Sequence, residues 1–84
     1  HSMADVAKYA KRVLVMNDSR LVMDGTPKEV FARAQELLDM GLDIPEVTRV
    51  FMRLKALGLP VEPVYTIDQA VAQLKRIRGG AANA

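Results

Sequence analysis

The sequence contains no cysteine and no tryptophan, and it has only two phenylalanines and two tyrosines among its 84 residues. Without cysteine there can be no disulfide framework, no thiolate nucleophile and no cysteine-ligated metal, which fits a reducing compartment. No apolar run approaches the roughly 18 to 20 residues that a membrane-spanning helix requires. Neither sign of charge predominates, because twelve basic and ten acidic residues are mixed along the chain and leave a net charge of +2. This mixture favours a solvated surface over a nucleic-acid footprint.

Aliphatic residues dominate what is present, since half of the sequence is hydrophobic. A chain of this length forms one domain at most and buries only roughly 60 to 65% of the surface that it exposes when unfolded. We therefore expect a thin, aliphatic core. The methionines fall on apolar stripes or strands, so we interpret them as core residues that fill gaps rather than as a soft metal site. They are Met3, Met16, Met23, Met40 and Met52.

The first 25 residues predict a short helix followed by a β-hairpin. Ser2 can cap a helix from Met3 to about Lys11. Two apolar runs, VLVM from Val13 and LVM from Leu21, flank the polar turn sequence NDS. Because the apolar residues of both runs are consecutive, we expect the hairpin to be covered on both faces.

Three amphipathic helices are predicted after the hairpin, which makes the fold class α+β and predominantly helical. The first carries a capping box of Thr26 and Glu29 around Pro27, runs to about Met40 and stops at Gly41. The second runs from the segment DIPEV to Leu57 and ends at Gly58, and the third follows a second capping box at Thr66 and Gln69. The residues of this third helix that we expect to face inward are Ile67, Ala70, Val71, Leu74 and Ile77.

Two groups of charged residues are candidates for ligand binding, but helix physics explains them more simply. Basic side chains in a last helical turn complement the helix dipole, and acidic ones near helix ends cap or complement it. The basic group is Lys75, Arg76 and Arg78, and the acidic group is Glu36, Asp39, Asp43 and Glu46.

The order of these signals resembles the C-terminal end of an ABC transporter ATPase. In that family a strand ends at a histidine, a short helix with an Asp-x-Ala pattern follows, and a hairpin leads through Gly-Thr-Pro into a helix with Glu-Val-Phe. One departure is Ser19, because the family commonly has glycine at this turn position and Asn17 or Asp18 is the alternative left-handed residue. The matching residues are His1, Asp5, Ala7, Arg12, Val13, Val15, Met16, Gly25, Thr26, Pro27, Glu29, Val30 and Phe31.

The continuation, GLDIPEVTRVFMRLKALGLPV and then YTIDQAVAQL, is similar to the C-terminal extension of cobalt-type, energy-coupling factor ATPases. The resemblance implies that the intact protein uses ATP and Mg²⁺ to drive import of cobalt or vitamins through a membrane-embedded partner. It implies a cytoplasmic location, peripheral at the inner face of the membrane. Residues 1–25 would end the nucleotide-binding domain, residues 26–78 would form a helical C-terminal domain, and we expect residues 79–84 to be a disordered tail.

The active-site residue that the resemblance assigns is His1, which corresponds to the switch histidine that contacts the γ-phosphate. An alternative is that His1 and Ser2 remain from an expression leader before a start at Met3. The 84 residues contain no phosphate-binding G-x-x-x-x-G-K-[ST] loop, no strand ending in the acidic pair that holds magnesium, and no LSGGQ-type signature. We therefore expect this chain to hold no cofactor and to be inactive alone.

The resemblance places the helical domain at the interface between two ATPase subunits, and we expect the chain to self-associate. The interface residues that we predict are Val13, Val15, Leu21, Val22, Met23, Phe31, Leu38, Phe51 and Leu54. A different class of function stays open, namely a free-standing small helical regulator that binds nucleic acid through its basic last helix. Such a protein gathers its lysines and arginines on one face, whereas our reading expects no nucleic-acid partner.

Overall fold

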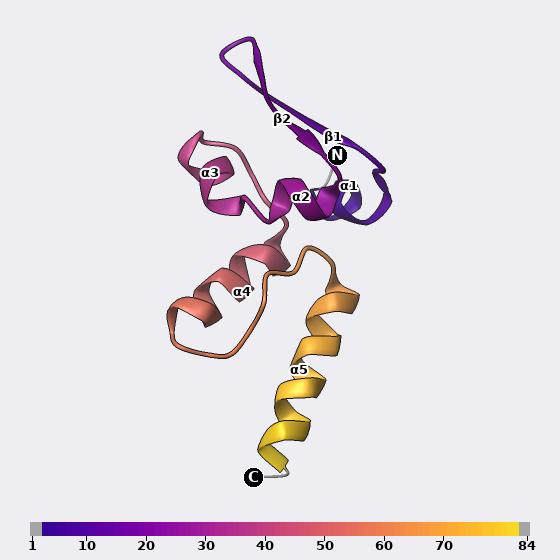
Figure 1. Cartoon of the computed structure of the whole chain (residues 1–84), viewed down its shortest axis with the longest axis vertical. Coiled ribbons are helices and arrows are strands. Elements are labelled where there is room, and N and C mark those ends of the chain that lie inside the picture. The colour runs from indigo at the N-terminus through magenta and orange to yellow at the C-terminus, as the bar shows by residue number, and fades with distance from the viewer. Residues whose placement is uncertain (1–2, 83–84) are drawn as a thin grey trace.

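A computed structural model describes residues 3–82, which form five helices and one antiparallel hairpin (Figure 1). This confirms the α+β fold class. The elements are α1 (Met3–Tyr9), β1 (Val13–Asn17), β2 (Arg20–Gly25), α2 (Pro27–Phe31), α3 (Ala34–Asp39), α4 (Glu46–Ala56) and α5 (Ile67–Ala82).

The hairpin turn uses two residues in the left-handed region. Asp18 has φ of 51° and Ser19 has φ of 62°, which is the pair of conformations that a type I′ turn requires. Val15 pairs with Met23, but the register then shifts so that the next residue of β1 pairs with Leu21. Val22 is therefore an extra residue in β2, a β-bulge that lets both strands keep one common inner face.

The helix predicted from Pro27 to Met40 is divided into α2 and α3, so that prediction was wrong in the middle. Arg33 leaves the helical conformation with φ of −100° and ψ of 38°, and its N–H bonds to the carbonyl of Val30, three residues back. The physical reason is packing. Phe31 in α2 and Leu37 in α3 are both 2% exposed, and the bend turns both toward the inner face of the hairpin.

Two glycines stop helices as the sequence predicts. Gly41 has φ of 78° and Gly58 has φ of 92°, a conformation that only glycine adopts without strain. The residue after each glycine donates its N–H to the carbonyl five residues back, as in a Schellman motif. These bonds run from Leu42 to Leu37 at 2.9 Å and from Leu59 to Leu54 at 3.1 Å. Helix α4 accordingly ends at Ala56, one residue before the predicted end.

Helix α5 starts where the second capping box places it, because the N–H of Gln69 donates to the Thr66 hydroxyl at 3.2 Å. The Gln69 side chain accepts from the N–H of Tyr65 rather than from that of Thr66. The helix runs to Ala82, so the disordered tail predicted from residue 79 is wrong as far as residue 82. Alanine favours helix strongly enough to continue it past the glycines. Residues 83 and 84 lie outside the described part of the chain.

The side chains form two small cores. The first lies between α1, the hairpin, α2 and α3, and it crosses the domain boundary predicted after residue 25; the second lies between α4, the extended segment after it, and α5. The rings of Phe31 and Tyr65, with centroids 6.5 Å apart, link the first core to the extended segment that also carries Val64 of the second core. Buried members of the first core are Ala7, Val15, Met23, Val30, Phe31, Ala34, Leu37 and Ile44, and those of the second are Phe51, Val61, Val64 and Ala70.

Candidate functional site

The predicted active-site residue, His1, and its neighbour Ser2 lie outside the described residues, so the structure does not place them. Across residues 3–82, no group of three or more histidine, cysteine, aspartate and glutamate side chains could hold a metal ion. Arg33 binds Glu36 through two hydrogen bonds of 2.6 and 2.7 Å, and Arg49 lies 3.2 Å from Asp43. These pairs support the interpretation of the acidic group as structural.

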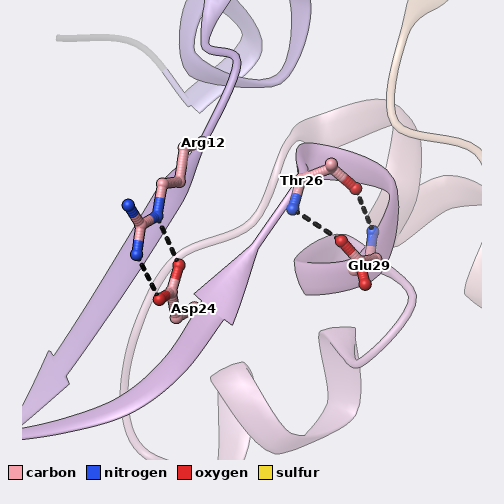
Figure 2. Close-up of polar contacts among 4 residues, drawn as sticks. All are labelled: Arg12, Asp24, Thr26 and Glu29. Carbon is pink, nitrogen blue, oxygen red and sulfur yellow. Dashed lines mark hydrogen bonds and ion pairs between the residues drawn. The ribbon is translucent and has the colours of Figure 1, made fainter.

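A bidentate ion pair ties the two strands together at the open end of the hairpin. Figure 2 shows the Arg12 guanidinium donating to both carboxylate oxygens of Asp24, at 2.7 and 2.6 Å. The hydrogen bonds from Arg12 lower the pKa of Asp24. Because both side chains remain exposed, this pair fixes geometry more than it adds stability.

Next to it, the predicted capping box at the start of α2 is confirmed. The backbone N–H of Thr26 donates to the Glu29 carboxylate at 2.9 Å, and the N–H of Glu29 donates to the Thr26 hydroxyl at 3.2 Å (Figure 2). The backbone hydrogen bond from Thr26 lowers the pKa of Glu29. The box sets the direction in which α2 leaves the hairpin.

The outer face of the hairpin is uncovered. Leu14, Met16 and Leu21 are between 54 and 55% exposed, whereas Val15 and Met23 on the inner face are buried. The expectation of a hairpin covered on both faces is wrong for the described residues, because α1, α2 and α3 pack on one face only. The prediction that all five methionines are core residues is wrong for Met16, because its side chain is exposed. Its exposure and that of Leu21 mark this face as an apolar surface.

Helix α5 carries a second uncovered apolar surface. Ile67 is 65% exposed, Val71 44% and Leu74 49%, although the sequence pattern predicts that all three face inward. Of the predicted inward stripe, only Ala70 is buried and Ile77 packs against the second core. The reason is geometric, since α5 extends away from the rest of the molecule and α4 covers one side of it alone (Figure 1). No signal in the sequence separates these three residues from the core, because a spacing of four and then three residues is also that of a buried helix face.

The predicted interface residues fall into three groups by exposure. Leu21 and Val22 are exposed; Val13, Leu38 and Leu54 are half-buried; Val15, Met23, Phe31 and Phe51 are buried within the cores of the chain itself. The residues best placed to meet a partner are therefore mostly ones that the prediction left out. On the hairpin and α5 they are Leu14, Met16, Ile67, Val71 and Leu74.

The molecule as a whole exposes more surface than a free-standing protein of its mass. Its accessible surface is 6101 Å², whereas a monomer of this size exposes about 5,000 Å². Its radius of gyration is 14.1 Å, against roughly 12 Å for a compact domain of this length. The difference of roughly 1,100 Å² is similar to one side of a specific protein interface, about 800 Å².

Comparison with known proteins agrees with this excess of exposed surface, because the relatives are longer than the chain. No family model matches the chain. The chain is 46% identical over 81 residues to "Energy-coupling factor transporter ATP-binding protein EcfA2" of Symbiobacterium thermophilum, covering 95% of the chain and 28% of that protein. It is 37% identical over 84 residues to the protein of the same name from Caldanaerobacter subterraneus, covering 99% of the chain and 29% of that protein. It is 42% identical over 72 residues to the EcfA1 protein of the latter organism. The chain thus spans less than a third of the length of these relatives.

Proposed function

This chain belongs to the family of energy-coupling factor transporter ATP-binding proteins, as the C-terminal part of such a protein, and on that premise we propose that it belongs to the ATP-hydrolysing subunit of an ABC importer. Its part in that subunit is twofold. His1 is the switch histidine, and the helical region joins the subunit to a second ATPase subunit. The observation that carries the second role is the pair of uncovered apolar surfaces, one on the outer face of the hairpin and one on the exposed side of α5.

The two surfaces have different partners in this proposal. The outer face of the hairpin, around Leu14 and Leu21, rests against the remainder of the nucleotide-binding domain in the same polypeptide. The exposed side of α5, around Val71, is directed to the second subunit. Support for this division comes from the distance between them, because the hairpin and α5 lie at opposite ends of a molecule with extents of 51 × 25 × 18 Å (Figure 1).

The role of His1 follows from its chemistry. A neutral imidazole donates a hydrogen bond from one nitrogen and accepts one at the other, so it can contact a γ-phosphate oxygen and the attacking water together. The phosphates and Mg²⁺ themselves need a glycine-lysine loop and an acidic strand end, which the 84 residues lack. ATP and Mg²⁺ are therefore held by the rest of the parent subunit, and we expect calorimetric titration of this chain alone with Mg-ATP to show no micromolar binding.

Within residues 3–82, every helix is too short or too polar to span a bilayer. In the proposal the chain reaches the membrane through a membrane-embedded partner of the transporter, at its cytoplasmic face, and the imported substrate is cobalt or a vitamin. The alternative function is nucleic-acid binding through the basic half of α5, where Lys75, Arg76 and Arg78 are exposed. Elsewhere Arg12, Arg33 and Arg49 are engaged with carboxylates.

An exchange chimera tests the proposal. The stretch of the Symbiobacterium thermophilum protein that matches this chain is replaced by residues 1–84, and Mg-ATP hydrolysis is measured in the assembled transporter. We expect the chimera to retain activity and His1→Ala to reduce kcat by about 10² to 10⁴-fold, the range for a positioned proton-transfer group. Ser2→Ala is the matched control and should leave the rate unchanged. A chimera that assembles normally and keeps its full rate with His1→Ala would contradict the assignment of His1.

A further inference from the structure

The exposed side of α5 has the spacing of a helix-pairing seam. Ile67, Val71 and Leu74 follow one another at intervals of four and three residues, the alternation of d and a positions in a coiled coil. Ala70 and Ile77 lie on another side of the helix, where they meet the second core. One side of α5 is thus used within the chain, and an apolar seam remains uncovered.

Charge is separated along the same helix. Asp68 lies in the first turn, and Lys75, Arg76 and Arg78 lie in the second half, all of them exposed. The acidic end is extended by neighbouring elements, because Asp5 of α1 and Glu46 of α4 line one hollow of about 170 Å³ with Ile67 and Asp68. Lys8 is the one basic residue that lines this hollow. One end of α5 is therefore mostly acidic and the other end is basic.

We propose that α5 pairs antiparallel with α5 of a second copy of this chain, so that the basic half of each helix lies over the acidic hollow of the other. The proposal rests on the proposed function, in which this region joins two ATPase subunits, and adds the pairing surface and its direction. Val71 packs opposite the partner's Leu74, and Ile67 packs opposite the partner's Arg78. Asp68 then comes within reach of the partner's Lys75.

Direction follows from charge. In a parallel pair the basic halves of the two helices would lie side by side, and so would the acidic ends, which repels at both ends. The antiparallel arrangement replaces both repulsions by attraction. It also makes the contact two-fold symmetric, the commonest arrangement of identical subunits.

Cysteine crosslinking tests the pairing, and the absence of native cysteine makes each introduced thiol unambiguous. The 84-residue chain is oxidised in a glutathione buffer at tens of micromolar. We expect a mixture of Ile67→Cys and Arg78→Cys chains to form the mixed disulfide, and neither variant to form a disulfide with itself. Arg76→Cys, exposed on another side of α5, is the control and should stay uncrosslinked. Efficient self-crosslinking of Ile67→Cys would instead show a parallel pair and overturn the proposal.

A charge exchange separates pairing from helix stability. Asp68→Lys and Lys75→Asp should each weaken dimerisation about ten-fold in sedimentation equilibrium, because each places like charges opposite one another. The double variant should restore it. If these residues act only on the helix dipole, the double variant would instead be worse than either single one, since both changes oppose the dipole. That outcome overturns the proposal, as does a mass near the 9.3 kDa of one chain for the unmodified protein.

Failure here is distinguishable from failure of the proposed function. Leu74→Asp should leave the circular dichroism of the chain unchanged, because Leu74 is exposed, but it should dissociate the dimer. A dimer that survives Leu74→Asp uses another surface and contradicts the pairing, while the ATPase chimera with its His1→Ala variant still reports on the proposed function. The two results are therefore independent.

Discussion

The hydroxyl of Thr48 donates to the backbone carbonyl of Val64 at 2.7 Å, and this bond joins α4 to the extended segment before α5. Thr48 is 1% exposed, so neither partner of the bond can turn to water instead. Within residues 3–82 no buried side-chain nitrogen or oxygen atom lacks a hydrogen-bond partner. The second core is therefore small, its buried side-chain polar atoms are all hydrogen-bonded, and it packs against the side of α5 that carries Ala70 and Ile77.

Replacing Thr48 should show how much this bond contributes. Thr48→Val keeps the shape of the side chain but leaves the Val64 carbonyl buried without a donor, so the free energy of unfolding should fall by about 1 to 3 kcal/mol. Thr48→Ser keeps the hydroxyl and should cost less. Urea unfolding followed by circular dichroism measures both. A loss for Thr48→Ser with none for Thr48→Val would mean that the methyl group, rather than the hydrogen bond, is what matters.

The Arg12–Asp24 pair should make stability depend on pH in acid. Hydrogen bonds from Arg12 lower the pKa of Asp24 in the folded state. The pair therefore stabilises the fold above the ordinary carboxyl pKa of about 3.9, and this contribution is lost as the pH falls through the lower, folded-state pKa. Arg12→Gln should melt at a lower temperature than the native chain at pH 7, and the two melting temperatures should converge below about pH 4.

The pKa of Glu29 is lowered as well, by the backbone hydrogen bond from Thr26, but Glu29 is present in both chains and its effect cancels in this comparison. A gap between the two melting temperatures that stays constant down to pH 2 would contradict the assignment. High salt should narrow the gap at neutral pH, since the pair is exposed.

The hairpin turn offers a stabilising change. Ser19 has a positive φ that glycine adopts without Cβ strain, so Ser19→Gly should raise the free energy of unfolding by roughly 1 kcal/mol. Asn17 is the matched control, because it lies in β1 and not among the residues with positive φ. Asn17→Gly should therefore destabilise the strand. Thermal unfolding of the two variants should move in opposite directions.

Local chemistry was predictable from the sequence, and long-range packing was not. The capping box at Thr26 and Glu29 and the helix stop at Gly41 depend on residues within a few positions of one another, and the structure confirms them. The break at Arg33 depends on where Phe31 and Leu37 must point to reach the hairpin, which no local pattern encodes.

The candidate surface shows the same limit. The sequence pattern of an apolar stripe on α5 is the same whether the stripe is buried by the same chain or by a second molecule. Only the structure shows that Val71 and Leu74 have no cover within residues 3–82.

A charge introduced on the outer face of the hairpin should affect stability far less than one introduced on the inner face. Leu21 is 54% exposed, so Leu21→Lys should change the free energy of unfolding by no more than about 0.5 kcal/mol. Val15 is 9% exposed on the inner face, and Val15→Asp should cost about 3 kcal/mol or more because it buries a charge without a partner. Urea unfolding measures both variants.

The sedimentation mass of hairpin variants distinguishes a dimer contact through the hairpin from one through α5. If α5 forms the contact between chains, Leu21→Lys should leave the sedimentation mass of the dimer unchanged. Val22→Lys, at the bulge on the exposed face, is a second variant of the same kind. Loss of the dimer in both variants, with circular dichroism intact, would place the contact on the hairpin, where an isolated two-stranded sheet with open edges invites pairing with another chain.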